Sequence, residues 1–323
     1  MSQAVPATSL QLSVVIPVYR AENSLNELYE RLVKVCEDQR LSFEIIFVED
    51  CGGDRSWEMI VKLAECDRRV RGVKLSKNYG QHTALVCGIH QAVGKVLITM
   101  DDDLEHPPEK IPKLLAALSN INSLVYAKPI NINRNGIWRE TLSKAFQLFS
   151  KFLLGFPEQQ DWAPFRAFYN QPGLLKDIPG HINNLDVYLA REFSAYTSIK
   201  ISYEIRKYGN SGYTIGKLMK HALQTSISTS IRPIRIASTI GTITLLLGAV
   251  LMFWVIGSYL YFENTQSGFT FLASAIIIFS GVQLLSLGII GEYIADIQRK
   301  VTFPTNYKMK EYMTAENLDW NKE

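Results

Sequence analysis

Three groups of acidic residues each follow a short apolar run of the sequence. The first run ends shortly before Glu22, the second ends at Glu49 and Asp50, and the third ends at Asp101. Apolar runs of about four to eight residues bounded by polar residues are typical of buried strands. In a parallel sheet the carboxyl ends of the strands meet at one edge, so these carboxylates are expected to converge there.

The third acidic group has the composition expected of a metal site. It places four carboxylates within five residues, namely Asp101, Asp102, Asp103 and Glu105. Carboxylate oxygens suit hard divalent cations such as Mg²⁺ and Mn²⁺, which also bind phosphate oxygens. Without a cation, so many like charges at one edge would repel each other. The alternative is a solvated acidic loop, which is less expected directly after an apolar strand.

Apolar runs rich in β-branched residues alternate with segments of helical periodicity. The expected strands cover residues 12–18, 43–48, 70–75, 95–100 and 123–126, and the expected helices cover residues 24–39, 56–64, 81–92 and 108–118. This alternation predicts an α/β fold with a mostly parallel sheet.

Several competing motifs are missing from the sequence. The first expected strand is followed by Pro17, Val18 and Tyr19, so the glycine-rich turn of a dinucleotide-binding fold is absent. Residues 211–218 lack the leading glycine and the final Ser or Thr of a P-loop. The five histidines form no H-E-x-x-H motif, and the four cysteines form no C-x-x-C pair, which favours free thiols in a reducing cytosol. The net charge of +3 argues against nucleic acid as a partner.

Two long uncharged runs predict a part embedded in a membrane. Residues 236–262 and 264–291 contain no Asp, Glu, Lys or Arg. At about 1.5 Å per residue, either run can cross a hydrocarbon core of about 30 Å as a helix. Lys and Arg lie on both outer flanks and not in the link, which predicts that the flanks face the cytoplasm. The alternative is a pair of buried core helices in a large soluble protein.

These patterns together predict five parts of the chain. They are an N-terminal tail (1–11), an α/β domain (12–212), a juxtamembrane amphipathic helix (213–232), two transmembrane helices (233–291, with spans at about 236–262 and 268–291) and a cytoplasmic C-terminal tail (292–323). The helix at 213–232 is expected to lie on lipid headgroups, with packing on the α/β domain as the alternative. The tail at 1–11 lacks the apolar core of a signal peptide, so the α/β domain is expected in the cytoplasm. Glycines in both spans would permit the close helix contacts of a homo-oligomer.

The order of these motifs resembles the family-2 glycosyltransferases that load a sugar onto a polyisoprenyl phosphate. The matching segments are Val14–Tyr19 with Glu22, Val48–Asp54, Leu75–Gly80, Met100–Glu109 and Gly291–Tyr293. Bactoprenol glucosyltransferases and dolichyl-phosphate mannosyltransferases belong to this group, and the resemblance covers about residues 12–293. It implies a GT-A fold, which is Rossmann-like, a nucleotide-diphosphate sugar donor, Mg²⁺ or Mn²⁺ as cofactor, and inversion at the anomeric carbon.

The resemblance also implies roles for individual residues of this chain. The metal would be held by Asp101, Asp103 and Glu105, and the catalytic residues would be Asp102, Asp103 and Asp161. The nucleotide sugar would be bound by Pro17, Tyr19, Glu22, Asp50, Lys77, Asp102, Arg206 and Lys207. The acceptor phosphate would be bound by Lys128, Arg134, Arg139 and Ser143. Exposed surface charges are the alternative reading of Arg206 and Arg139.

Three segments depart from the family pattern. Pro164 stands where an Asp is usual before the sixth strand, so Asp161 is the nearest substitute. Gly212 replaces a frequent Lys, which leaves binding of the diphosphate to Arg206 or Lys207. The segment 183–196 lacks the Trp-Val-Gly signature near the sugar pocket, so the identity of the sugar is open.

The acceptor chemistry can be argued from the phosphate itself. A phosphate monoester has a second pKa of about 6, so at neutral pH it is largely ionised and nucleophilic without a strong general base. The expected reaction is transfer of a hexose, expected to be glucose from UDP-glucose, to undecaprenyl phosphate at the cytoplasmic face of the cell membrane. One rival is a processive polysaccharide synthase, although the Q-x-x-R-W segment is missing. The other is a non-catalytic membrane scaffold with a vestigial pocket, which Pro164 and Gly212 favour.

Overall fold

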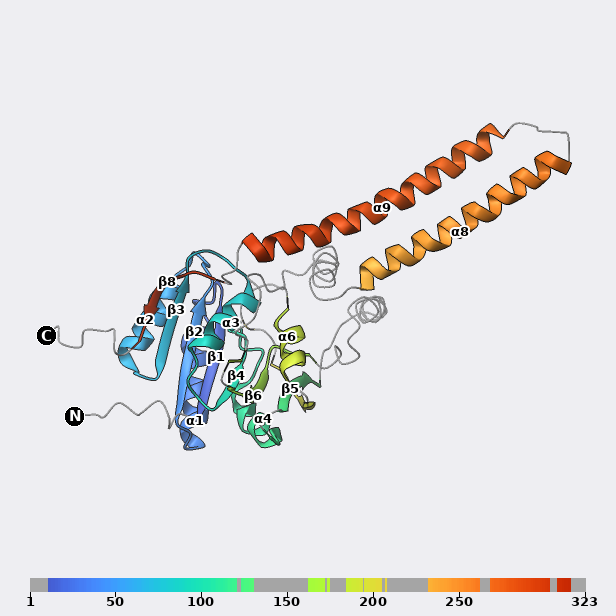
Figure 1. Cartoon of the computed structure of the whole chain (residues 1–323). Helices are drawn as coiled ribbons and strands as arrows, with labels where there is room; N and C mark the ends of the chain where they lie inside the picture. Colours follow the sequence, from blue (N-terminus) through green and yellow to red (C-terminus); the bar gives the residue numbers. More distant parts are fainter. Residues whose placement is uncertain are drawn as a thin grey trace. The chain divides into compact units, whose positions relative to one another are not determined.

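The chain forms two compact units. The computed structural model describes residues 11–120, 123–130, 162–171, 173–174, 184–193, 195–204, 207, 232–261, 268–302 and 307–314 (Figure 1). The sheet unit comprises Met1–Thr141, Glu158–Tyr213 and Phe303–Glu323. The helical unit comprises Leu142–Pro157 and Thr214–Thr302.

The sheet unit is built on one eight-stranded sheet with the order β7-β5-β6-β4-β1-β2-β3-β8. The strands are β1 (Leu12–Val18), β2 (Phe43–Glu49), β3 (Val70–Leu75), β4 (Val96–Thr99), β5 (Ser123–Pro129), β6 (Arg166–Tyr169), β7 (Ala195–Ile201) and β8 (Met309–Met313). The central strands β4, β1, β2 and β3 are parallel, and so are β5 and β7. Strands β6 and β8 are antiparallel to their neighbours. The predicted α/β fold with a mostly parallel sheet is confirmed.

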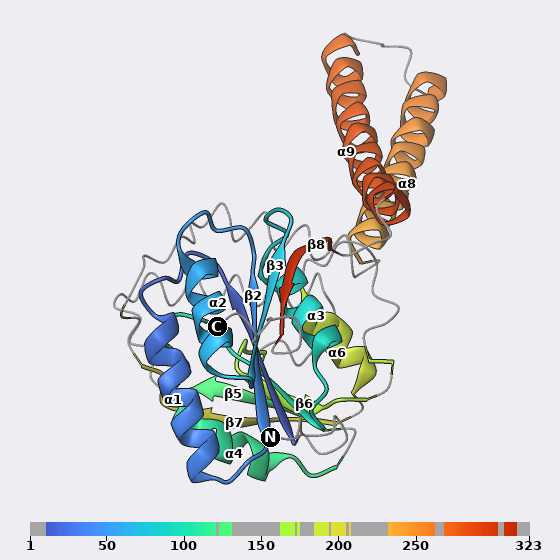
Figure 2. The ribbon, with the colours of Figure 1, turned by 90° about the vertical axis from the view of Figure 1, so that its left-hand side faces the viewer.

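Helices cover both faces of this sheet. One face packs against α1 (Leu25–Asp38), α2 (Ser56–Cys66) and α4 (Ile111–Ala117), which follows the short 3₁₀ turn η2 (Pro108–Lys110). The other face packs against α3 (Gln81–Gln91) and α6 (Leu185–Glu192). Figure 2 shows α1 and α2 on one side of the sheet and α3 and α6 on the other. Every residue of β1 and β2 is therefore buried, which explains why these strands are mostly apolar.

The register of the sheet brings the acidic groups to one edge. Val18 at the end of β1 pairs with Glu49 at the end of β2, and Val15 pairs with Thr99 at the end of β4. The turns that follow these three strands begin on the same side of the sheet, which we call the carboxyl edge. Ligands of open α/β sheets bind at this edge.

The helical unit contains two long helices that contact each other, α8 (Arg232–Tyr261) and α9 (Phe269–Thr302). Exposed large apolar side chains run along both helices, among them Leu246, Phe253, Trp254, Leu284 and Ile294. Within the parts of the chain that the structure describes, no helix is both long enough and apolar enough to cross a membrane. The predicted spans therefore stay a prediction. The juxtamembrane helix predicted at 213–232 lies outside the described residues, except for Arg232.

The segment predicted as a C-terminal tail, 292–323, contains a helical part and a strand. Helix α9 continues to Thr302, and Met309–Met313 forms β8 on the free edge of β3. Glu311 of β8 accepts a hydrogen bond from Trp57 Nε1 at 3.0 Å. A five-residue strand with two charged side chains has no clear apolar period, and charged side chains are common on edge strands. The sequence pattern therefore does not reveal this strand.

Candidate active site

The turn that follows β4, which we call the acid turn, spans residues 101–105 and is tied to two neighbouring segments. Asp101 accepts a hydrogen bond from Gln81 Nε2, at the start of α3, at 2.5 Å. Asp102 accepts one from the Tyr19 amide, after β1, at 2.9 Å. The acid turn therefore lies against the end of β1 and the N-terminus of α3 at the carboxyl edge.

The acid turn also has internal constraints. Asp103 Oδ1 accepts a hydrogen bond from the Glu105 amide at 3.0 Å. Leu104 lies between these two residues with a φ of 64°, in the left-handed region, and its side chain is fully buried. A left-handed residue with a side chain costs about 1–2 kcal/mol, so burial of Leu104 must help to hold this backbone in place.

The charges of the acid turn act on one another. Burial, and to a smaller extent the nearby carboxylates of Asp101 and Asp103, raise the pKa of Asp102 to about 7, although the hydrogen bond from the Tyr19 amide opposes this rise. At neutral pH a carboxyl group with this pKa is only partly ionised. A cation beside it would favour the ionised form. The acid turn therefore carries an excess of negative charge in the absence of a positive ligand.

Asp50 connects the end of β2 to the loop that follows β3. Its carboxylate accepts hydrogen bonds from the amides of Tyr79 and Gly80, both at 2.7 Å. Burial raises the pKa of Asp50, and the two amide hydrogen bonds lower it. Gly80 has a φ of 89°, which side chains rarely permit, so this loop requires a glycine. Asp50 thus shapes the loop that carries Lys77, whose Nζ lies 5.1 Å from the centre of the Tyr79 ring.

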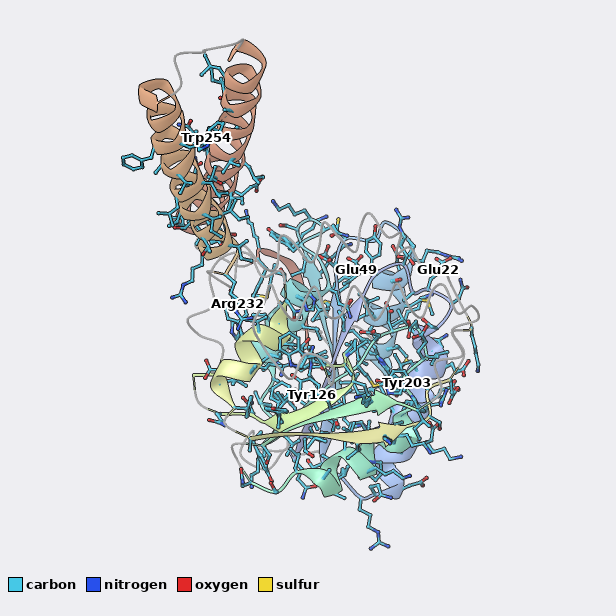
Figure 3. The ribbon with its side chains drawn as sticks, turned by 90° about the vertical axis from the view of Figure 1, so that its right-hand side faces the viewer. Glu22, Glu49, Tyr126, Tyr203, Arg232 and Trp254 are labelled. Carbon is cyan, nitrogen blue, oxygen red and sulfur yellow. The ribbon has the colours of Figure 1, made fainter. Side chains whose placement is uncertain are left out.

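Figure 3 labels Glu22, which follows β1, and Glu49, which ends β2, and both residues form further hydrogen bonds. The Glu22 amide donates to Asp54 Oδ2 at 3.3 Å, and the Glu22 carboxylate accepts from the Arg55 amide at 3.2 Å. Glu49 is 3% exposed and accepts a hydrogen bond from the Gly52 amide at 2.6 Å. The acidic groups after β1, β2 and β4 are thus brought together, as the sequence predicts.

Two more residues predicted to bind the nucleotide lie at the end of β1. Pro17 is buried and pairs with Val48 of β2. Tyr19 is 46% exposed, so its ring is accessible to a flat ligand. The structure thus places Pro17, Tyr19, Glu22, Asp50 and Lys77 at the carboxyl edge or in the loops that leave it.

A buried ion pair lies beside the end of β4. Arg166, the first residue of β6, is 1% exposed and pairs with Asp186 of α6. Its Nε also donates to Thr99 Oγ1 at 2.9 Å, and Thr99 Oγ1 donates to the Pro164 carbonyl at 2.7 Å. Pro164 therefore contributes a backbone oxygen at the position where the family pattern has an acidic side chain. Asp161 lies outside the described residues.

The predicted cationic residues are placed less completely. Lys207 is exposed and forms an ion pair with Glu27 of α1, which raises the pKa of Lys207. Lys128 is partly buried on β5. The other predicted cations and the predicted serine lie outside the described residues: Arg134, Arg139, Ser143 and Arg206. The site for the acceptor phosphate therefore stays a prediction.

Asp101, Asp103 and Glu105 were expected to bind a metal. Across the described parts of the chain, no three His, Cys, Asp or Glu side chains gather into a ready-made metal cluster. Mg²⁺ bound to a phosphorylated substrate usually needs only one or two carboxylates, because phosphates and water supply the other ligands. The oxygen donors of Asp101 and Asp103 fit that requirement, and both charges act on Asp102. The metal site stays a prediction.

Two residues of this site do not stand out in the sequence. Gln81 holds Asp101, and His106 Nδ1 accepts a hydrogen bond from the Asp101 amide at 3.0 Å. Gln81 lies twenty residues before its partner, so no local spacing connects them. His106 directly follows the acid turn, and this adjacency is the sequence feature that could have marked it as part of the site.

Two solved sugar-phosphoglycerate synthases share the architecture of this chain. Mannosyl-3-phosphoglycerate synthase from Rubrobacter xylanophilus superposes with a TM-score of 0.52 at 15% identity, covering 72% of this chain and 76% of that one. Glucosyl-3-phosphoglycerate synthase from Mycobacterium tuberculosis, in complex with Mn²⁺, UDP-glucose and phosphoglyceric acid, superposes with a TM-score of 0.50 at 19% identity, covering 69% and 79%. At this identity the likeness shows the fold, which is the GT-A fold.

Relatives in sequence identify the family to which the chain belongs. Undecaprenyl-phosphate 4-deoxy-4-formamido-L-arabinose transferase of Pectobacterium atrosepticum is 32% identical over 94% of both chains. The enzyme of the same name from Proteus mirabilis is 31% identical over 97% of both chains. Residues 13–177 match glycosyl transferase family 2, and the chain belongs to this family. It is a glycosyltransferase.

Proposed function

We propose that this protein transfers a sugar from a nucleotide diphosphate to undecaprenyl phosphate at the cytoplasmic face of a membrane. The observation that carries this proposal is the similarity to undecaprenyl-phosphate transferases, which extends over 94% of both chains. Similarity over that length includes the two long helices as well as the sheet unit. The carboxyl edge, with Asp50 and the acid turn, is the proposed binding site for the nucleotide sugar.

The sugar proposed here is 4-deoxy-4-formamido-L-arabinose. The sequence alone favoured glucose, but the relatives in the comparison are named for the formamido sugar. A UDP carrier is proposed because glucosyl-3-phosphoglycerate synthase, which shares the fold, was solved with UDP-glucose. Pro17, Tyr19 and Asp50 are the residues proposed to bind the base.

A divalent cation, Mg²⁺ or Mn²⁺, would be held by Asp101 and Asp103, with Glu105 close by. When bound, it would neutralise charge on the departing diphosphate. Gln81 and the Glu105 amide each occupy one carboxylate oxygen, which fixes how the two aspartates face a ligand. Asp102 is held by the Tyr19 amide, so it links the acid turn to the proposed base pocket.

The acceptor phosphate is proposed to attack the anomeric carbon directly, with inversion. Because the phosphate is largely ionised at neutral pH, the site needs cations that position it more than a strong base. Lys128, Arg134, Arg139 and Ser143 are the proposed binding residues for this phosphate. A hydroxyl acceptor would instead require a general base.

Helices α8 and α9 are proposed to anchor the enzyme in the membrane. They are 30 and 34 residues long, and each contains most of one of the two uncharged runs. Their exposed leucine, isoleucine and aromatic side chains would be costly in water over such a length. A polyprenyl acceptor stays in the bilayer, so an anchored transferase meets its second substrate at the membrane surface.

The direct test is a transfer assay with the purified full chain in detergent. The protein is incubated with undecaprenyl phosphate, Mn²⁺ and either UDP-4-deoxy-4-formamido-L-arabinose or UDP-glucose, and the lipid product is measured by mass spectrometry. Asp103→Asn should lower the rate by at least about 100-fold because it removes a carboxylate charge from the acid turn. Glu65→Gln, an exposed acid on α2, is the control and should keep full activity.

The products of this assay distinguish between the possible donor sugars and between the possible reactions. Product with the formamido sugar alone supports the proposal, and product with UDP-glucose alone restores the original expectation for the donor. Products that carry many sugars would indicate a processive synthase. Absence of a lipid product with every nucleotide sugar, or full activity of Asp103→Asn, would overturn the proposed function.

A further inference from the structure

His106 is a buried histidine that holds the backbone of the acid turn. It is 2% exposed, and its Nδ1 accepts the hydrogen bond from the Asp101 amide at 3.0 Å. A ring nitrogen that accepts a hydrogen bond carries no proton, so in this arrangement the proton of the neutral ring is on Nε2. The hydrogen bond from the Asp101 amide thus requires an acceptor atom at the position of Nδ1, and it does not require a charged ring.

The ring of His106 is fixed by two aromatic neighbours from other segments. It stacks on Phe165 with ring centres 5.4 Å apart and planes at 26°. The edge of Tyr203 meets it at 4.8 Å and 80°, and the Tyr203 hydroxyl donates to the Ala127 carbonyl at 2.6 Å. The segments before β6 and after β7 therefore orient the imidazole.

The backbone that His106 holds is one that needs support. Leu104 is left-handed, and the Glu105 carbonyl is tied to the Glu204 amide at 3.0 Å. The Asp101 amide is at the other end of the same turn, and the rotation of this peptide sets the direction of the Asp101 carboxylate. If the amide lost its acceptor, the turn would lose the constraint closest to that carboxylate.

We propose that His106 is a positioning residue, which fixes the Asp101 amide so that the carboxylates of Asp101 and Asp103 face a divalent cation in one arrangement. This inference rests on the proposed function of the acid turn as a metal site. Residues that orient metal ligands typically change metal affinity about 10- to 100-fold when replaced.

Two variants test separately whether the hydrogen-bond acceptor or the aromatic ring of His106 is required. His106→Asn retains an acceptor oxygen close to the place of Nδ1 but loses the ring, whereas His106→Phe retains an aromatic ring and loses the acceptor. Mn²⁺ affinity is measured by electron paramagnetic resonance of the free ion, in the presence of UDP. His106→Phe should bind Mn²⁺ about 10-fold more weakly or worse, and His106→Asn should stay within about 3-fold of the parent protein.

A second measurement does not depend on the metal. Hydrogen exchange at the Asp101 amide should be at least about 5-fold faster in His106→Phe than in the parent protein or His106→Asn, because a lost hydrogen bond is worth about 1 kcal/mol. His106→Leu replaces His106→Phe if that variant does not fold. Equal losses of Mn²⁺ affinity in the Asn and Phe variants, or unchanged exchange in His106→Phe, would overturn the role of His106. If the parent protein binds no Mn²⁺ in the presence of UDP, the proposed metal site is overturned. Hydrogen exchange at the Asp101 amide would then still test whether His106 holds this amide.

Discussion

The three aspartates of the acid turn differ in environment although they are adjacent in sequence. Asp101 is held by a side chain, Asp102 by a distant amide and Asp103 by an amide of its own turn. Each of these bonds uses one oxygen and sets the direction of the other. The sequence predicts that carboxylates gather here, since they follow buried strands. It does not predict these partners, because they come from residues up to 83 positions away.

The cysteines allow a test of burial at single residues. Burial raises the pKa of Cys36 and of Cys87 to about 12, and Cys51 and Cys66 are exposed. At pH 8 a thiol with a pKa of about 12 is ionised in about one molecule in ten thousand, and the thiolate is the reactive form. We therefore expect iodoacetamide to label Cys51 and Cys66 in the native protein at pH 8.

Mass spectrometry of the labelled protein distinguishes the sites. The control is the same reaction in denaturant, where all four cysteines should react. Rapid labelling of Cys36 or Cys87 in the native protein at pH 8 would contradict the burial of these thiols. Raising the pH toward 10 should increase their labelling, since the ionised fraction rises about tenfold with each pH unit below the pKa.

Helix α3 lies close to the sheet because it carries a glycine where the two meet. A methyl group added to Gly88 would lie 2.3 Å from Val15 Cγ1 and 3.1 Å from Val48 Cγ2. Glycine to alanine within a helix usually stabilises by up to about 1 kcal/mol, but overpacking of a core costs about 1–3 kcal/mol. We therefore expect Gly88→Ala to lower the free energy of unfolding, as measured with urea.

The control for this variant is Gly241→Ala in α8, where an added methyl group meets no atom within 4 Å. It should leave the unfolding of the sheet unit unchanged. A Gly88→Ala protein as stable as the parent would mean that α3 can move away from β1 at no cost. Because α3 also carries Gln81, such a movement would reach the acid turn.

The predictability of each element depends on its burial. Strands β1 to β3 could be predicted because helices cover both faces of the sheet there, so most residues of these strands are buried and apolar. The helices between them show a clear apolar period for the same reason. Strand β8 lies at the edge, where side chains contact water on one side, so its pattern carries little information. The pairing of Arg166 with Asp186 depends on the tertiary fold and has no signal in local sequence.

At the scale of the whole chain, residues on both sides of the two long helices build the same sheet. Strand β8 pairs with β3, and the Lys308 backbone carbonyl accepts a hydrogen bond from the Ser76 amide at 2.9 Å. Ser76 begins the loop that carries Lys77 and Tyr79. The segment after α9 is thus part of the support for the proposed nucleotide site.

Shortening the chain tests this support. A protein that ends at Thr302 lacks β8 and its contacts with Trp57 and Ser76, whereas a protein that ends at Thr314 keeps them. Loss of several backbone hydrogen bonds should remove about 2–4 kcal/mol, which lowers the melting temperature of the sheet unit by about 5–10 °C. The protein that ends at Thr314 should melt like the full chain. Equal melting of all three proteins would show that β8 is dispensable for stability.

The position of β8 also has a consequence for biosynthesis. A ribosome makes β3 early, but its edge partner emerges only after both α8 and α9 have been made. At about 5–20 residues per second, the backbone groups of Val70–Leu75 on that edge wait about 10–50 s for Met309–Met313. During that interval the nascent chain presents an open strand, the kind of edge that pairs with wrong partners. Pairing of β8 with β3 is therefore a late step in the folding of the sheet unit, because it follows synthesis of both α8 and α9.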